Sequence, residues 1–139
     1  MSKTRDEGLT KFKAMMGNAA HDTFKKLTLA DDLVGDMARL AADFAFGAVW
    51  SRPGLNPDQR SLVTLGVLIA QSHPAELKNH FRIALSNGLA ANELEEVVLQ
   101  TVPYVGFPAA TAATTALIEV LRETGASRNA ATPEESGVL

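Results

Sequence analysis

Apolar residues recur at helical spacing along most of this chain of 139 residues. The clearest stripe stands four, three and four residues apart and consists of Leu33, Met37, Leu40 and Phe44. Thr28 supplies a start signal before this stripe, and Gly47 supplies a stop signal after it. No segment alternates convincingly between apolar and polar residues. The pattern therefore predicts an all-α fold of about six helices.

Glycine and proline mark the turns between the expected helices. The helices are predicted over about residues 4–16, 28–46, 58–71, 74–86, 92–102 and 108–123. Asn92 and Glu95 indicate a capping box, and Pro103 should kink or end the helix that they start. We expect one domain over residues 1–125, followed by a flexible tail over residues 126–139.

The helix from about residue 58 to 71 is apolar nearly all round and is expected to be buried. Its polar residues Arg60, Thr64 and Gln71 lie within about 40° of one another on a helical wheel. A buried polar stripe needs a partner, such as a ligand, water or the polar groups of a neighbouring helix.

The next helix offers such a partner. Glu76, His80, Ile83 and Asn87 share one stripe at its edge. Glu76 precedes His80 by one turn, and a carboxylate there should fix the imidazole tautomer and raise its pKa, as general acid–base catalysis requires. The alternative is an ordinary i,i+4 pair on a surface helix. A metal site formed by His73, Glu76 and His80 is a weaker alternative, since Pro74 pushes His73 out of helical geometry.

The composition narrows the possible functions. The chain has 46% hydrophobic residues, a net charge of −3 and no basic patch interleaved with aromatics, so nucleic acid is not an expected partner. It has no cysteine, which excludes disulfides, thiol redox chemistry and thiolate metal sites. The charged start and the lack of a membrane-length apolar run predict a cytoplasmic protein without a membrane partner.

Four segments in order resemble the carboxymuconolactone decarboxylase family. They are residues 47–55 (GAVWSRPGL), 60–64 (RSLVT), 76–80 (ELKNH) with Asn87-Gly88, and 104–110 (YVGFPAA). The resemblance implies the AhpD-like helical fold and a closed homo-oligomer, often a hexamer. In the peroxidase branch of that fold a Cys-x-x-Cys-x-x-x-His motif is expected. Here His73, Glu76 and His80 stand at the corresponding positions, so peroxidase activity is excluded.

The resemblance also implies a reaction: cofactor-free decarboxylation of an anionic, carboxylated unsaturated lactone in aromatic catabolism. Loss of CO2 would leave a carbanion that the lactone itself delocalises, and the protein would deliver one proton. We expect no metal. The candidate site residues are His80 as proton donor, Glu76 as its orienting carboxylate, Arg60 and Arg52 as carboxylate binders, and Trp50 and Tyr104 as pocket walls.

The N-terminal region departs from the family pattern. Where the decarboxylases carry a pair of arginines, then Leu-Gly and Asp-Ala-His, this chain has Lys13 and Ala20, with His21 one position late. This departure leaves two alternatives: another acid–base enzyme of the same fold with a different substrate, or a non-catalytic oligomeric binding protein.

Overall fold

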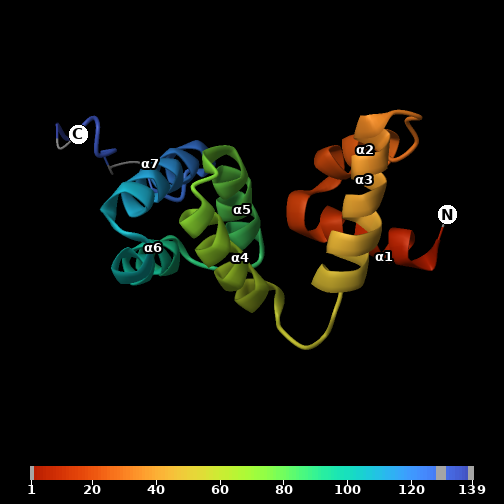
Figure 1. Ribbon diagram of the computed structural model, residues 1–139, viewed down its shortest axis with the longest axis horizontal. Coiled ribbons are helices and arrows are strands. Elements are labelled where there is room, and N and C mark those ends of the chain that lie inside the picture. Colours follow the sequence, from red (N-terminus) through yellow and green to blue (C-terminus); the bar gives the residue numbers. More distant parts are fainter. Residues whose placement is uncertain (1, 128–130, 138–139) are drawn as a thin grey trace. The chain divides into compact units, whose positions relative to one another are not determined.

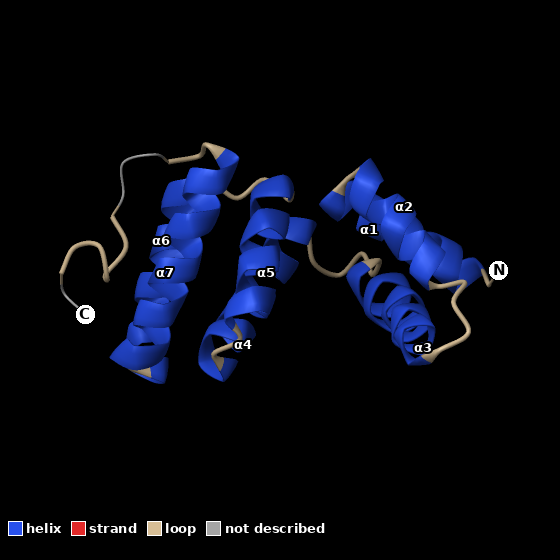
Figure 2. Cartoon of the chain, turned by 90° about the horizontal axis from the view of Figure 1, so that it is seen from above, coloured by secondary structure: helices blue, strands red, loops and turns tan. Residues whose placement is uncertain are grey.

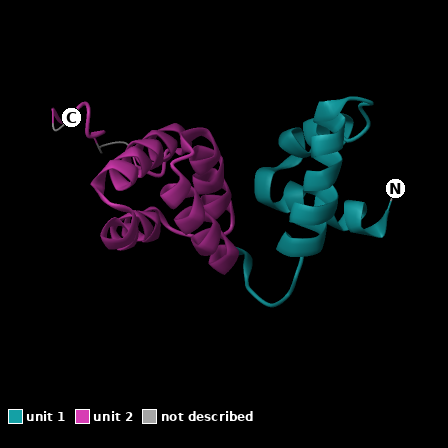
Figure 3. Cartoon of the chain, viewed as in Figure 1, with its two compact units in different colours: residues 1–57 teal, residues 58–139 magenta. Residues whose placement is uncertain are grey.

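The computed structural model describes residues 2–127 and 131–137, and within them the chain is helical with no strand (Figure 2). Seven α-helices and one π-helical segment occur in this part of the chain, which confirms the all-α prediction. The chain forms two compact units, residues 1–57 and 58–139 (Figure 3). The single domain expected over residues 1–125 stays a prediction.

The first unit holds four helical elements (Figure 1). They are α1 (Lys3–Met16), α2 (Asn18–Leu27), α3 (Leu33–Leu40) and the π-helical segment η1 (Ala41–Trp50), which continues directly from α3. Phe12, Phe24 and Phe46 form an aromatic cluster between these elements, with ring centroids 4.4–6.0 Å apart. Arg5 binds the Asp43 carboxylate through two hydrogen bonds of 2.8 and 2.5 Å.

Two glycines let α1 lie almost in backbone contact with η1. A Cβ atom on Gly8 would stand 1.9 Å from the carbonyl oxygen of Ala42, and one on Gly47 would stand 2.3 Å from that of Thr4. Gly47 was expected to end a helix at residue 46, but the helix passes through it as far as Trp50. Because Gly47 has no side chain, it allows the close approach of α1.

The start of α3 also differs from the prediction. Thr28 does not begin this helix: its hydroxyl donates to the Lys25 carbonyl at 2.7 Å and closes α2, which the sequence pattern did not predict. Asp32 is the N-cap of α3, and its carboxylate accepts from the Gly35 amide at 2.8 Å. The side chains of the predicted apolar stripe are at least 60% exposed, namely Leu33, Met37, Leu40 and Phe44.

The second unit is a bundle of four helices: α4 (Pro57–Gln71), whose first residue ends the first unit, α5 (Pro74–Ser86), α6 (Ala91–Val105) and α7 (Phe107–Thr124). Each contributes to one apolar core, whose fully buried members include Leu65, Ile69, Phe81, Leu94 and Leu121. On the side of α5 that faces α7, Lys78 pairs with Glu119, and Arg82 pairs with Glu123.

The α6 helix begins earlier and ends later than predicted. The capping contact is made by Glu93, whose carboxylate accepts from the Ala90 amide at 3.0 Å, and not by Asn92 and Glu95. Pro103 does not end the helix, which continues to Val105. Gly106, with φ of 84°, then allows the sharp passage into α7.

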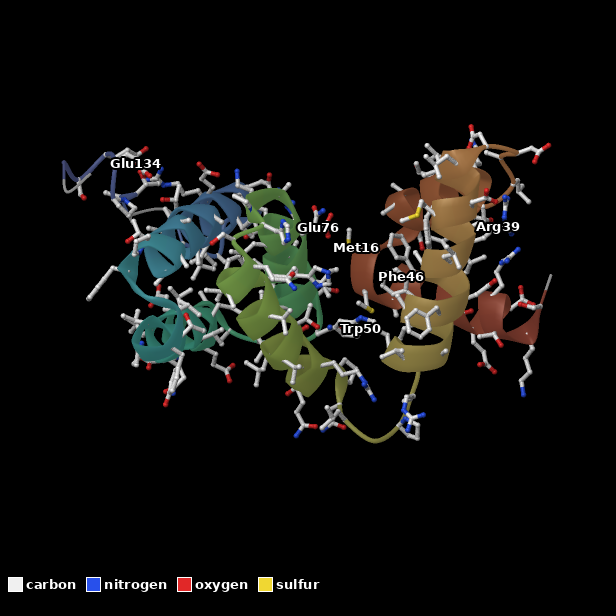
Figure 4. All side chains as sticks on the ribbon, viewed as in Figure 1. Met16, Arg39, Phe46, Trp50, Glu76 and Glu134 are labelled. Atoms are coloured by element: carbon white, nitrogen blue, oxygen red, sulfur yellow. The ribbon has the colours of Figure 1, made fainter. Side chains whose placement is uncertain are left out.

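The described part of the expected tail forms a short turn on α7. Thr132 and Glu135 make a capping box, and the Glu135 carboxylate also receives two hydrogen bonds from Arg122, of 2.9 and 2.5 Å. These donors, Arg122 first among them, lower the pKa of Glu135 to about 2. Glu134, labelled in Figure 4, accepts from the Thr115 hydroxyl at 3.1 Å. Residues 128–130 and 138–139 of the predicted tail lie outside the described residues.

No helix in the described part of the chain is long and apolar enough to cross a bilayer.

Candidate active site

The candidate site is built on the hairpin of α4 and α5. Only Ser72 and His73 separate the two helices, and Ser72 has a φ of 53°, in the left-handed region that reverses the chain within two residues. At the other end of the hairpin, the Asn87 side-chain amide donates to the Ser61 hydroxyl at 3.0 Å. The start of α4 therefore lies beside the end of α5, so the helices are antiparallel.

The α5 helix places His80 at the border of the core, as its sequence pattern predicts. Leu77, Phe81 and Ala84 line the fully buried face, while Glu76 is exposed at the first turn (Figure 4). His80 is partly buried, and its Nδ1 atom is withdrawn from solvent. Ile83, which the sequence places on the same stripe as Glu76 and His80, is buried.

Burial dominates the protonation of His80. It lowers the pKa of the imidazole below its ordinary value of 6.5, and the negative charge of Glu76 offsets only part of that shift. The expected rise in the pKa of His80 is therefore wrong for the protein without substrate. The cause is that Glu76 is exposed, where water screens its charge, while the ring is desolvated. At neutral pH the ring is mainly uncharged.

The α4 helix carries Arg60, the predicted carboxylate binder. Arg60 is partly buried, with its Nε atom withdrawn from solvent. Thr64 donates from its hydroxyl to the Arg60 carbonyl at 2.9 Å, so this hydroxyl is occupied within its own helix. The stripe beside Arg60 is buried and consists of Ser61, Leu65 and Ile69. Leu62, Val63 and Val67 are exposed, so α4 is buried on one side and not all round.

The other three predicted site residues lie elsewhere in the chain. Trp50 ends η1 in the first unit and is 9% exposed, while Arg52 is exposed in the segment that follows. Tyr104 is near the end of α6 and is 80% exposed. The roles of these three residues stay predictions. The structure thus brings Glu76 and His80 onto one helix and Arg60 onto the helix paired with it.

The metal alternative finds no support in the described residues. Across residues 2–127 and 131–137, no three His, Asp or Glu side chains converge as ligands, and this includes His73, Glu76 and His80.

Sequence reasoning missed the Ser61–Asn87 contact. A signal was present, because Ser61 is the polar member of an otherwise apolar i, i+4, i+8 stripe with Leu65 and Ile69. Such a hydroxyl requires a hydrogen-bond partner when it is buried. The identity of that partner, two helical turns beyond His80, is set by the tertiary pairing of α4 and α5.

Comparison with known proteins decides the family. The model of the carboxymuconolactone decarboxylase family matches residues 35–119. The chain belongs to the carboxymuconolactone decarboxylase family. It is 40% identical over 101 residues to a 4-carboxymuconolactone decarboxylase of Acinetobacter baylyi, which covers 73% of this chain and 75% of the relative. It is 38% identical over 103 residues to a nitrosuccinic acid decarboxylase of Metarhizium robertsii, which covers 74% of this chain and 71% of the relative. Both relatives are named as decarboxylases, which supports decarboxylase chemistry in this member.

Proposed function

We propose that this protein is a cofactor-free decarboxylase of a small dicarboxylate that carries its own electron acceptor. One observation carries this proposal: a histidine at the edge of the core and a partly buried arginine lie on the paired helices α5 and α4, in a chain similar to two proteins named as decarboxylases. A carboxylated unsaturated lactone of the 4-carboxymuconolactone type is the first candidate substrate.

The two substrates named by the relatives share a chemical core. Nitrosuccinic acid and 4-carboxymuconolactone each hold a carboxylate on a carbon that also bears a CH2–carboxylate arm, which makes both of them substituted succinates. In each, that carbon is joined to a group that accepts an electron pair, either a nitro group or an unsaturated lactone. The proposed substrate class is therefore a succinate with an acceptor group, in which one carboxylate leaves and the other stays.

The proposed reaction balances without an external electron sink. The C–C bond to the leaving carboxylate breaks, CO2 departs, and the electron pair moves into the acceptor group of the substrate. For the lactone, the pair passes through the double bond to the lactone carbonyl, and one proton then adds at the carbon next to that carbonyl. The remaining tasks of the protein are to hold the dianion, to keep water from the leaving carboxylate and to supply the proton.

His80 is the proposed proton carrier, and Arg60 is the proposed binder of the retained carboxylate. An uncharged imidazole is a weak acid, so His80 has to become protonated before it can donate. A bound dianion favours that protonation, because a carboxylate within about 4–6 Å raises the pKa of a histidine. Glu76 adds to the same effect from one turn away. Tyr104, in the same compact unit, is a further proposed substrate contact.

Direct measurement of CO2 release tests the proposed function. Purified protein, treated with chelator in a parallel sample, is mixed with 4-carboxymuconolactone or with nitrosuccinate. The proposal expects release above background from at least one substrate, unchanged by chelation. Three variants test the roles of the site residues. We expect His80→Ala to lose most of its turnover and Glu76→Gln to lose a smaller part of it. Arg60→Ala should bind the substrate more weakly. If neither substrate releases CO2, the remaining alternatives are a binding protein or a different acid–base enzyme of this family.

We also propose that the protein works as a closed homo-oligomer, with a hexamer expected from the family resemblance. Exposed apolar side chains on α3 and η1, and on the outer side of α4, support this proposal, because such patches favour association. Light scattering at micromolar concentration is the test, and a monomer mass would refute it.

A further inference from the structure

We infer that Ser61 and Asn87 are a positioning pair that fixes Arg60 against the α5 stripe carrying His80. The inference rests on the proposed function of that site. It starts from the hydrogen bond of 3.0 Å in which the Asn87 side-chain amide donates to the Ser61 hydroxyl, at the open end of the α4–α5 hairpin.

Ser61 occupies a position that packing alone would give to an apolar residue. It is 1% exposed and heads the stripe that continues with Leu65 and Ile69, both fully buried in the core. A hydroxyl buried without a hydrogen bond is costly, whereas an alanine at such a position carries no polar group to satisfy. The hydroxyl therefore contributes little net stability. Its contribution is to favour the one register of α4 on α5 that places Asn87 beside it.

Asn87 is itself held firmly at the end of α5. Its backbone amide donates to the Ile83 carbonyl at 2.8 Å. Gly88, with φ of 102°, then turns the chain, so that the backbone amide of Leu89 donates to the Ala84 carbonyl at 3.0 Å. Leu89 is buried beyond this turn. The side-chain amide of Asn87 thus projects from a fixed C-cap toward α4, which makes it a suitable reference point for the position of that helix.

The geometry of the hairpin connects this bond to the candidate site. Arg60 is adjacent to Ser61 in α4, and Asn87 continues the α5 stripe of Glu76 and His80. Slippage of α4 by one helical turn would move Arg60 by about 5.4 Å along α5. A displacement of that size is larger than a bidentate carboxylate contact tolerates. The Ser61–Asn87 bond disfavours such a shift and holds the Arg60 backbone at a constant distance from His80.

The test uses Ser61→Ala, Asn87→Ala and the double variant in the full-length protein. The control is Glu123→Gln, which weakens the ion pair between Glu123 and Arg82 and so loosens α5 against α7, on the side away from α4. Two readouts are recorded for each protein. The first is the exchange rate of the Arg60 Nε–H with solvent by NMR, assigned with Arg60→Lys. The second is KM and kcat for whichever substrate the wild-type protein turns over.

We expect the Arg60 Nε–H of both single variants to exchange at least fivefold faster than in the wild type, because this atom is withdrawn from solvent in the ordered hairpin. We expect KM to rise about three- to tenfold with kcat within twofold, as loss of one positioning hydrogen bond implies. Ser61→Ala should add no further change in the Asn87→Ala background, because the bond that it would break is already lost there. Glu123→Gln should change neither readout.

Unchanged Arg60 exchange in Ser61→Ala and Asn87→Ala would overturn the inference, even if both variants melt at lower temperature. Equal effects in the Glu123→Gln control would overturn it too, because they would show a general loosening of the bundle. If the wild-type protein releases no CO2 from either substrate, the proposed function fails. The NMR readout then still decides whether this pair positions Arg60.

Discussion

The pH dependence of turnover tests the proton-carrier role of His80 without any mutation. In the protein without substrate, burial lowers the pKa of His80 below 6.5, so little imidazolium exists at neutral pH. If the imidazolium is the proton donor, kcat/KM should fall tenfold for each pH unit above that lowered pKa. The descending limb of kcat/KM should therefore begin below pH 6.5.

The limb of kcat should lie at higher pH, because kcat reports the enzyme with substrate bound. A substrate carboxylate within about 4–6 Å of the imidazole raises its pKa by about 1–3 units. At an effective dielectric constant of 20, one such charge at 6 Å contributes about 2.8 kcal/mol, which corresponds to about two units. We therefore expect the descending limbs of kcat and kcat/KM to be separated by about 1–3 pH units.

Steady-state kinetics from pH 4.5 to about pH 9, at constant ionic strength, measure both limbs. His80→Ala serves as the control: it should lower kcat by about 100- to 10,000-fold and abolish the descending limb. Coincident limbs in the wild-type protein would refute protonation of His80 by substrate binding. If kcat/KM instead rises with pH through this range, the uncharged imidazole of His80 acts as a general base.

Three further outcomes follow from single contacts. Arg60→Ala should raise KM about 10- to 100-fold with kcat nearly constant, because it removes a charge-assisted contact that is present in the ground state and in the transition state alike. A fall in kcat at constant KM would contradict this role. Gly8→Ala should lower the free energy of unfolding by about 1–3 kcal/mol in denaturant melts, because the added methyl group would meet the Ala42 carbonyl. Gly54→Ala is the control: a methyl group there would meet open space, so the free energy of unfolding should change little. Arg122→Ala should speed hydrogen exchange at the Glu135 backbone amide at least tenfold, because Arg122 anchors the capping box of Thr132 and Glu135. Unchanged exchange would show that the capping box is stable without Arg122.

The bounds of α4, α5 and α7 were predicted to within one residue because these helices follow ordinary rules. Pro57 and Pro74 begin α4 and α5, and the glycines after α5 and α7 have the positive φ of helix stops. Apolar residues at 3.6-residue spacing identified the buried face of α5, whereas the apolar run of α4 wrongly suggested burial on all sides. The sequence also predicted that His80 lies at the edge of the core. Its pKa could not be predicted in the same way, because the balance of desolvation and charge depends on how deeply each group is buried in the bundle.

The first unit was predicted less well for three physical reasons. The α2 helix has ten residues, and its apolar stripe is short and consists of Ala20, Phe24 and Leu27, so it was not recognised as a helix of its own. The η1 segment has π-helical hydrogen bonding, whose period differs from the 3.6 residues per turn of an α-helix. Gly47 resembles a helix stop in sequence, but the structure uses it for close contact with the Thr4 carbonyl. Only the three-dimensional neighbour distinguishes these two uses of glycine.

The lowered pKa of His80 favours a substrate with a second negative charge that can stabilise the imidazolium. Glu76 alone does not restore the pKa of His80, because it is exposed while the ring is desolvated. A neutral or monoanionic ligand whose carboxylate is fully paired with Arg60 would leave His80 in the same uncharged state. A dianion retains a second negative charge after that pairing, and this charge can stabilise the imidazolium. Proton delivery is then coupled to the presence of both carboxylates, so a monocarboxylate analogue should bind at Arg60 and yet turn over poorly.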